Sequence, residues 1–311
     1  MSHVQKATIV VHNGRFHTDD VFATAIIEIL LKRRGLFELE QPTIVRTRDE
    51  NIIREAEYVM DVGGVYDADS RRFDHHQKGG AGVRANGIPY ASFGLVWKTY
   101  GVELAGSEKV AQVIDERLVQ AIDANDNGVS VYKPLFEKVY PYGIYDGVSS
   151  LNPTWKEGED DRDVGFFKAV AAAEVIVERE IAWARDIEEA RSAVEKLYAT
   201  SFDKRICVFD KPYPSHVLTQ YPEVLYAIKP NVHVAGGTWK VEAIAAEENS
   251  YTSRKPFPSI WAGKRDQELA QVTGVADAVF CHNGRFLLTA GSQESALKLA
   301  LLAADFKEEN L

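Results

Sequence analysis

The alternation of short apolar segments with helical segments in the first half of the chain is the feature that most constrains the fold. The apolar segments are rich in β-branched side chains, which favours β-strands. Helix signals lie between them: Thr18 is a suitable N-cap, and the carboxylates of Asp19 and Asp20 suit the positive end of a helix. Such alternation predicts a parallel sheet with crossover helices, an α/β fold. The predicted strands are residues 7–11, 43–47 and 58–62, and the predicted helices are residues 18–34 and 49–57.

Length and the later residues predict two domains. A chain of 311 residues is long for a single domain. Residues 1–160 are the predicted α/β catalytic domain, and residues 161–200, which lack proline, are a predicted helical connection of one helix or two. Residues 201–311 begin again with a strand and predict a smaller α/β accessory domain, which we expect to face the first across a cleft. Other predicted elements are a hairpin at 65–73, helices at 90–100, 107–124 and 294–306, and strands at 205–209, 224–228, 239–246, 278–281 and 286–290.

Composition excludes several classes of protein. The two cysteines, Cys207 and Cys281, cannot form a disulfide framework or a four-cysteine zinc site. The net charge of −10 is the wrong sign for a protein that wraps duplex DNA non-specifically, although bound cations can reverse the sign inside one cleft. Apolar runs are too short to span a bilayer and no leader precedes the first strand, so we expect a cytoplasmic protein with no membrane partner.

Histidines and aspartates gather after the predicted strands. Because the carboxyl ends of parallel strands meet at one edge of a sheet, we expect these side chains to lie close together. A single His or Asp in such a place is more often a cap or a core residue, but the joint pattern predicts a site for two divalent cations. Carboxylates suit Mn²⁺ and Mg²⁺, and imidazole is accepted more readily by Mn²⁺, Fe²⁺ or Zn²⁺. The candidate residues are His12, His17, Asp19, Asp61, Asp74, His75, His76, Asp123 and Asp126.

The pattern resembles the DHH phosphoesterase superfamily, which includes RecJ-type exonucleases, nano-RNases and manganese inorganic pyrophosphatases. Asp74-His75-His76, preceded by His12…Asp19 and by Asp61, carries this resemblance. Residues 12–20 and the phrase Tyr-Val-Met-Asp-Val-Gly-Gly at 58–64 are similar to the MYG exonuclease branch, also labelled a metal-dependent protein hydrolase family. Further similarity covers nearly the whole chain, at residues 122–128, 261–266 and 282–286. The resemblance implies a DHH-type parallel-sheet catalytic domain and an accessory domain.

The resemblance also implies metal-binding roles. His12 and His17 would bind the first cation, Asp19 and His75 would bind the second, and Asp61 would bridge the two. Two divalent cations per chain are therefore expected, with Mn²⁺ favoured and Mg²⁺ or another ion possible.

One further bridging carboxylate is implied, and it is Asp123 or Asp126; the spacing does not choose between them. The two catalytic side chains are His76, which would face the scissile phosphate, and Asp74, which would hydrogen-bond and orient a histidine. One departure is that many DHH members carry an Asp at the position matched here by His17, one residue closer to the first His, which leaves the preferred metal open.

The sequence His-Asn-Gly-Arg-Phe occurs twice, at 12–16 and at 282–286. The second copy lacks the following His-x-Asp-Asp, so it cannot repeat the metal site. The resemblance implies that the second copy binds substrate, and the alternative interpretation of this copy is an Asn-Gly β-turn. For the basic loop nearby, the alternative to substrate binding is a solvated surface. The candidate substrate-binding residues are His282, Asn283, Gly284, Arg285, Arg254 and Arg265.

The favoured function is metal-dependent hydrolysis of phosphodiester bonds in single-stranded RNA or short oligonucleotides, with attack by a hydroxide that bridges the two cations. A 3′-to-5′ direction is only what the resemblance implies. Alternatives are hydrolysis of a small phosphorylated metabolite such as a dinucleotide or pyrophosphate, which the acidic charge favours, or a metal-binding protein without catalysis. Peptide hydrolysis is disfavoured because the chain lacks His-Glu-x-x-His. A small closed pocket would indicate a metabolite, whereas an open groove with exposed aromatic side chains would indicate oligonucleotides. The sequence leaves the oligomeric state open.

Overall fold

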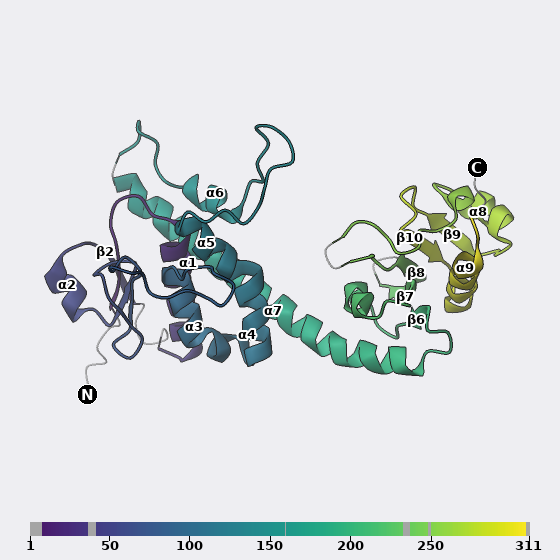
Figure 1. The fold of residues 1–311 in the computed structure, drawn as a ribbon, viewed down its shortest axis with the longest axis horizontal. Coiled ribbons are helices and arrows are strands. Elements are labelled where there is room, and N and C mark those ends of the chain that lie inside the picture. Colours follow the sequence, from purple (N-terminus) through teal and green to yellow (C-terminus); the bar gives the residue numbers. More distant parts are fainter. Residues whose placement is uncertain (1–7, 37–41, 159, 233–236, 248–249, 309–311) are drawn as a thin grey trace. The chain divides into compact units, whose positions relative to one another are not determined.

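The computed structural model describes residues 8–36, 42–158, 160–232, 237–247 and 250–308 (Figure 1). The chain forms two compact units, Met1–Arg185 and Asp186–Leu311, called unit 1 and unit 2 below. Each unit contains one five-stranded sheet, so the mixed α/β class predicted from the sequence is confirmed.

The sheet of unit 1 has the strand order β2-β1-β3-β5-β4. Strands β2, β1, β3 and β5 run parallel, and β4 pairs antiparallel with β5 as the predicted hairpin. The predicted parallel sheet is therefore present; Ala7, the first residue of the first predicted strand, lies outside the described part. The strands are β1 (Thr8–Val11), β2 (Thr43–Arg46), β3 (Tyr58–Met60), β4 (Tyr66–Asp67) and β5 (Arg72–Phe73).

Helix α1 (Thr18–Arg33) is buried on every side from Thr18 through Ile27, polar residues included. It packs against α3 (Ser92–Ala105) and against β3, so its first turn is enclosed by protein rather than water. The segment predicted as one helix at 107–124 consists of two α-helical pieces joined by a π-helical turn. The remaining helices of this unit are α2 (Glu50–Glu55), α4 (Glu108–Ile114), the π-helical η1 (Asp115–Val119), α5 (Gln120–Asp126) and α6 (Ile144–Ser149).

Helix α7 (Asp160–Thr200) is a single uninterrupted helix over the segment predicted as one helix or two. Its first half belongs to unit 1, where Phe166, Val170 and Val177 enter the core at i, i+4 and i+11. Arg185 ends this part by donating from Nε to the carbonyl of Ala105, 2.7 Å away, which satisfies the end of α3.

The sheet of unit 2 has the order β6-β7-β8-β10-β9, with β6 and β7 parallel and the other pairs antiparallel. Helix α9 (Gln293–Asp305) packs its apolar face, with Leu299 and Ala303, against this sheet. The other elements are β6 (Ile206–Val208), η2 (Ser215–Gln220), β7 (Tyr226–Asn231), β8 (Thr238–Ala243), η3 (Ser259–Trp261), α8 (Asp266–Thr273), β9 (Ala278–Cys281) and β10 (Leu287–Ala290).

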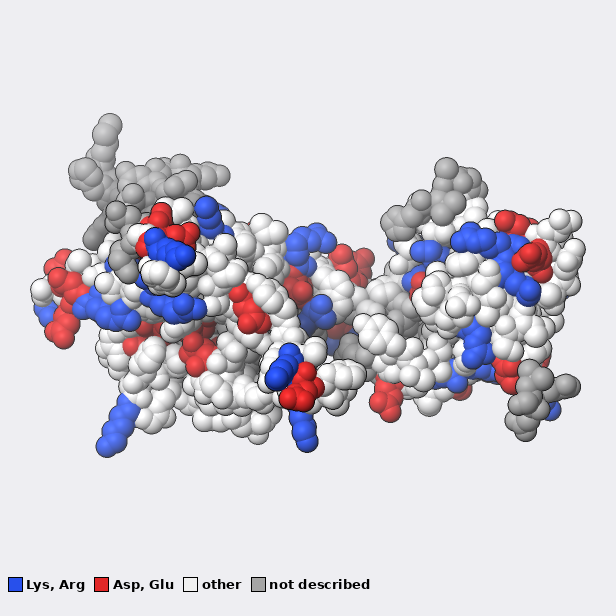
Figure 2. Space-filling view, turned by 90° about the horizontal axis from the view of Figure 1, so that it is seen from above, with Lys and Arg blue, Asp and Glu red and all other residues white. Residues whose placement is uncertain are grey.

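The described surface carries charges of both signs (Figure 2), and the two cysteines are buried. On the face seen in Figure 2, the described Lys and Arg side chains are interspersed with Asp and Glu rather than gathered in one stripe. Cys207 and Cys281 are buried free thiols in β6 and β9. Within the described ranges, no helix combines the length and the apolar character needed to cross a membrane.

Candidate metal centre

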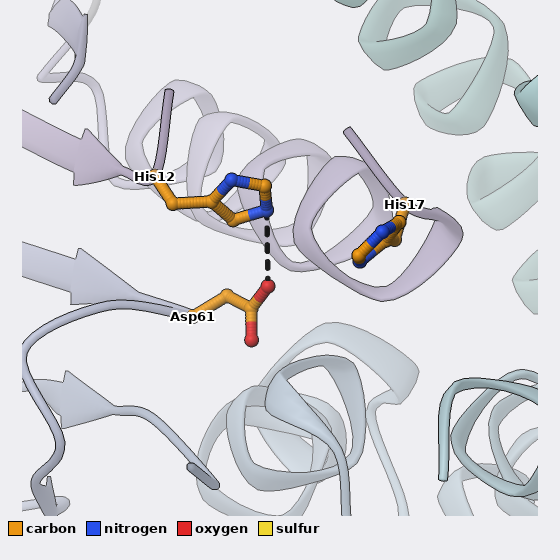
Figure 3. A group of neighbouring side chains, drawn as sticks. All are labelled: His12, His17 and Asp61. Carbon is orange, nitrogen blue, oxygen red and sulfur yellow. Dashed lines mark ion pairs between the residues drawn. The ribbon is translucent and has the colours of Figure 1, made fainter. Parts of the chain in front are cut away.

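Three neighbouring parallel strands deliver the first site residues to one edge of the sheet. His12 follows β1, Asp61 follows β3, and Asp74-His75-His76 follows β5. Asp61 has a positive φ of 55°, which turns the chain sharply at the strand end, and its N–H donates to the carbonyl of Phe73 over 3.2 Å. Figure 3 shows the imidazole of His12 directed at the Asp61 carboxylate, with His17 beside them.

Asp61 lies between two histidines. Its Oδ2 is 3.2 Å from Nε2 of His12, and its Oδ1 is 3.2 Å from Nε2 of His75. Each carboxylate oxygen therefore faces a different imidazole, which is the arrangement of a carboxylate that can bridge two cations.

The second side of the centre comes from two helices. Asp19 lies in the first turn of α1, and Asp126 is the last residue of α5. Oδ2 of Asp126 is 3.1 Å from Nε2 of His75, and its Oδ1 is 3.7 Å from Nδ1 of His17. Three overlapping groups have potential ligand atoms within 4.8 Å of one another: His12, His17 and Asp61; His17, Asp19 and Asp126; and Asp61, His75 and His76.

The donor atoms of this cluster fit divalent cations. Buried polar atoms are almost always hydrogen-bonded, yet here several buried oxygens and nitrogens converge, and their short contacts are to other members of the same cluster. Such atoms need positive charge or protons between them, and a mixed set of carboxylates and imidazoles suits Mn²⁺ and related ions. The atoms are His12 Nε2, Asp19 Oδ1, Asp20 Oδ2, Asp61 Oδ1 and His75 Nε2.

Two histidines of the cluster, His12 and His75, hold protons strongly when carboxylates are their partners. Burial lowers the pKa of His12, but Asp20 and Asp61 outweigh it and raise the value to about 10. His75 behaves alike: burial opposes the shift, and Asp126 and Asp61 raise its pKa to about 10. Burial would raise the pKa of Asp61, but His12 and His75 lower it to about 2. A cation must therefore displace these protons to bind.

The pKa of Asp19 is shifted in the opposite direction from that of Asp61. Burial raises the pKa of Asp19 well above the usual range, and the negative charges of Asp61, Asp126 and Asp20 add to this. Four carboxylates thus share one enclosed space, which is unfavourable without cations.

The structure separates Asp126 from Asp123. Asp126 joins the cluster, whereas Asp123 is fully buried and lies outside the three groups. Oδ1 of Asp123 accepts from the N–H of Gly94 over 2.9 Å, and Oδ2 is 2.7 Å from Nη1 of Arg84. The close approach requires glycine, since a Cβ at Gly94 would lie 1.8 Å from Oδ2 of Asp123. The carboxylate of Asp123 is thus occupied by partners of its own.

Asp20 is the residue that sequence reasoning missed, because it was interpreted only as a favourable helix start. Its Oδ2 lies 3.0 Å from Nε2 of His12, and its Oδ1 accepts from the N–H of His17 over 3.0 Å. The signal that could have found it is the apolar run Val21–Ile27 in the same helix, which buries the first turn of α1, including Asp19 and Asp20.

His76 and Asp74 form a hydrogen-bonded pair. Oδ1 of Asp74 lies 2.7 Å from Nδ1 of His76 and accepts from its N–H over 3.1 Å, while Oδ2 accepts from the N–H of Gly64. The His76 side chain is 59% exposed and 3.4 Å from Asp61. It therefore lies at the border between the cluster and solvent.

Two cavities flank the centre within unit 1. The larger, of about 1020 Å³, is open and is lined by His12, Asp61, His76, Arg15, Arg48 and Arg54 among others. The smaller, of about 320 Å³, lies by Asp126 and Tyr145. His17 and Arg15 line both, so the centre can be approached from two directions.

The second His-Asn-Gly-Arg-Phe forms the turn between β9 and β10. The N–H of Arg285 donates to the carbonyl of His282, and Asn283 and Gly284 are exposed at the tip. Arg285 has a positive φ of 59°, and its Nη1 donates to Oε1 of Glu308 over 2.8 Å.

The two other predicted arginines are also engaged within unit 2. Arg254 donates to the carbonyls of Thr219, Tyr221 and Val224, and Arg265 stacks on Phe280 at 4.3 Å. Of this predicted set, Asn283 and Gly284 are exposed; the N–H of Gly284 donates to Nδ1 of His282 over 2.9 Å.

A His/Asp centre that fits divalent metal, placed at the carboxyl edge of a parallel sheet and open to a wide cavity, defines a metal-dependent hydrolase. The model of the MYG1 exonuclease family, described as "Uncharacterised protein family (UPF0160)", matches residues 8–304, and the chain belongs to this family. The MYG1 protein of Dictyostelium discoideum is 30% identical over 94% of this chain and 95% of its own length. The MYG1 exonuclease of Mus musculus is 30% identical over 93% and 82%, and that of Homo sapiens is 28% identical over 93% and 83%.

Two solved structures are also similar at low identity. RecJ in complex with Mn²⁺ from Thermus thermophilus is 13% identical, with a TM-score of 0.28 over 98% of this chain and 53% of that one. The pGpG-specific phosphodiesterase PggH from Vibrio cholrae is 12% identical, with a TM-score of 0.30 over 97% and 99%.

Proposed function

We propose that this chain is a metal-dependent phosphodiesterase that removes nucleotides from the 3′ end of single-stranded RNA or short oligonucleotides. The observation that carries the proposal is the convergence of buried His and Asp side chains whose short contacts are to one another, beside an open cavity that His12, His17 and Asp61 line. Family membership supports the exonuclease activity, because relatives of this chain in mouse and man bear that name.

In this proposal His12 and His17 would hold one cation, Asp19, His75 and Asp126 would hold a second, and the Asp61 carboxylate would be shared by the two sites. Two divalent cations, with Mn²⁺ favoured, would supply Lewis acidity that lowers the pKa of water and neutralises charge on a phosphoryl group. On the opposite side of the His12 ring, Nδ1 lies 2.9 Å from the carbonyl of Asn13, which orients the ring and leaves Nε2 facing Asp61 and Asp20.

His76 is the proposed contact to the reacting phosphate. Asp74 engages Nδ1 of His76, which leaves Nε2 for a substrate oxygen. The hydrogen bond that Nδ1 of His76 donates to Asp74 raises the pKa of His76, so the ring keeps its proton to higher pH and can donate to a phosphate oxygen. Asp74 therefore acts by positioning His76.

An oligonucleotide fits the surroundings better than a small metabolite. The larger cavity is open and, at about 1020 Å³, is at the top of the range for sites that enclose a small ligand. The segment 129–158 of the same unit carries exposed aromatic side chains that can stack on bases: Tyr132, Phe136, Tyr140, Tyr142 and Trp155. Lys133 and Lys138 lie between them in the sequence, and Lys156 follows Trp155.

We further propose that residues 1–160 form the catalytic domain and residues 201–311 an accessory substrate-binding domain that acts in the cytoplasm on the same substrate. In the accessory domain, the exposed tip at Asn283 and Gly284 is the available surface, and Arg285 would exchange Glu308 for a phosphate.

The test is a substrate panel. The purified protein with Mn²⁺ is offered RNA and DNA oligomers labelled at the 5′ end, dinucleotides and pyrophosphate, with Asp61→Asn as the inactive control. We expect stepwise shortening of RNA from the 3′ end with release of 5′-mononucleotides, abolished by chelator. Mid-chain fragments before monomers would contradict end-directed attack. Turnover of pyrophosphate or dinucleotides alone would select the metabolite alternative, and peptide cleavage without phosphodiesterase activity would overturn the proposal.

A further inference from the structure

Three arginines line the larger cavity beside the metal centre. Arg15 lies in the loop between β1 and α1, Arg48 follows β2, and Arg54 lies near the end of α2. All three are exposed, and none of them forms an ion pair with a carboxylate in the described part of the chain. They are called the arginine wall below.

Arg46 is a neighbouring arginine whose contacts indicate a structural role. Arg46, two residues before Arg48, has a side chain only 2% exposed, with Nη1 2.6 Å from Oδ1 of Asp163. Its guanidinium also lies 4.6 Å from the ring of Phe166. The charge of Arg46 is neutralised and covered, whereas the charges of the arginine wall are neither.

Neutral acceptors hold two members of the wall in place. Nη1 of Arg48 donates to Oδ1 of Asn13 over 2.6 Å and to the Asn13 carbonyl, and Nη2 of Arg15 donates to Oγ of Ser149 over 2.5 Å. These hydrogen bonds fix each guanidinium without cancelling its charge, which leaves donors for an anionic ligand.

Such charges are unusual in a chain of net charge −10, and the described charged side chains on the face seen in Figure 2 are interspersed. Glu50, which shares α2 with Arg54, also lines the cavity, but it forms no ion pair with Arg54 among the described contacts. Three uncompensated guanidinium groups along one cavity match a ligand with several phosphates in a row, since each guanidinium can donate two parallel hydrogen bonds to a phosphate.

We propose that the arginine wall binds the sugar–phosphate backbone of the substrate, at phosphates that flank the bond being cleaved. This inference rests on the proposed function, because it takes the substrate to be an oligonucleotide. Arg15, which lines both cavities, contacts the phosphate next to the reacting one. Arg48 and Arg54 hold phosphates farther along, so binding strengthens as the substrate lengthens.

The test compares two double variants that each remove two positive charges. Arg48→Ala/Arg54→Ala removes wall residues. Arg34→Ala/Arg71→Ala removes exposed arginines that pair with Glu103 and Glu57 and do not line the cavity. The ligand is a fluorescein-labelled uridine hexamer with phosphorothioate linkages and 2′-O-methyl groups, which resists cleavage. Its binding is measured by fluorescence anisotropy in Mn²⁺ at a series of salt concentrations from low to high.

We expect the wall variant to bind the hexamer about tenfold to a hundredfold more weakly, as for the loss of charge-assisted hydrogen bonds. Each phosphate contact on a single strand contributes about 0.7 to the slope of log affinity against log salt. Loss of the two contacts should therefore reduce the magnitude of this slope by about 1.4. The Arg34/Arg71 variant should match the wild type in both measurements. Equal affinity and slope in the wall variant, or no hexamer binding by the wild type, would overturn the inference.

A second measurement separates failure of this inference from failure of the proposed function. Wild-type protein with Mn²⁺ is assayed on bis(4-nitrophenyl) phosphate, a diester with a single phosphate. Absence of turnover there, with hexamer binding intact and dependent on the wall, would refute phosphodiesterase activity and leave the anion site standing. Turnover there, with hexamer binding indifferent to Arg48 and Arg54, would refute the wall alone.

Discussion

Asp126→Asn and Asp123→Asn form a matched pair of variants, because two carboxylates three residues apart on α5 lie in different surroundings. Asp126 faces His75 and His17, and Asp123 faces Arg84. If Asp126 is a metal ligand, its loss should weaken stabilisation by Mn²⁺. The loss of Asp123 should leave that stabilisation intact.

The size of the effect follows from linkage between binding and folding. A cation that binds only the folded protein stabilises it by RT ln(1 + [L]/Kd), so each tenfold loss of affinity removes about 1.4 kcal/mol. Removing even an indirect partner of a metal ligand costs about 10- to 100-fold in affinity, so a direct charged ligand belongs at the upper end, near 2.7 kcal/mol. For a unit the size of Met1–Arg185, this corresponds to about 5–10 °C in Tm.

Differential scanning calorimetry with excess Mn²⁺ and with chelator measures the shift for each protein. Asp123→Asn is expected to change the stability of the metal-free protein by itself, because Arg84 keeps only Asp115 as a carboxylate partner. Comparing each variant with and without Mn²⁺ removes that contribution. A full Mn²⁺ shift in Asp126→Asn, or a lost shift in Asp123→Asn, would refute the assignment of Asp126 as the ligand.

Three further predictions concern other parts of the chain. Burial, followed by the charge of Glu174, raises the pKa of Glu28 to about 7. The folded state therefore binds this proton more tightly than the unfolded state does. The free energy of unfolding falls as pH rises from about 4.5 through 7. Chemical denaturation should find Glu28→Gln more stable than wild type by about 1–3 kcal/mol at pH 8, after allowance for solvent screening, with the gain shrinking towards pH 5. His12→Ala should lower the metal content found by elemental analysis and abolish turnover, whereas Arg285→Ala should keep its metal and lower kcat/KM about tenfold to a hundredfold; unchanged kinetics would leave Arg285 as a partner of Glu308 only. Trp155 is 89% exposed, so Trp155→Ala should unfold at the wild-type temperature yet bind a hexanucleotide more weakly, by about 1–3 kcal/mol if a base stacks on it; equal binding would remove Trp155 from the substrate path.

The carboxyl edge of the sheet could be predicted because it depends on local pattern alone. Apolar runs that end in His12 and Asp61 fix two strand ends, and parallel pairing brings those ends together whatever the rest of the chain does. The Asp74-His75-His76 segment follows from the same rule, since β5 is the next strand in the sheet. The observed strand boundaries differ from the predicted ones by one or two residues. This difference does not alter the edge of the sheet at which the strands end.

The basic residues of unit 2 could not be interpreted from sequence, because their partners are distant along the chain. Arg254 is held by carbonyls 30 to 35 residues earlier, and Arg285 by Glu308, the last described residue. A local cluster of positive charge looks the same whether its donors face a ligand or the protein's own carbonyl groups. Conversely, the arginine wall is spread over three elements and forms no cluster in the sequence.

The choice between Asp123 and Asp126 was open for a reason that lies in helix geometry. Residues three apart on an α-helix project from nearly the same face, so both carboxylates point towards similar surroundings. The π-helical turn η1, Asp115–Val119, comes directly before α5, and the extra residue in such a turn rotates everything after it relative to a regular helix. That rotation moves Asp123 and Asp126 together, and what separates them is the space at Gly94, which has no side chain: Asp123 enters the protein interior there and binds Arg84, while Asp126 at the helix end lies beside His75. A regular helix over 107–126 would have presented a different residue to the cluster, which is why the π-turn is part of how the centre is built.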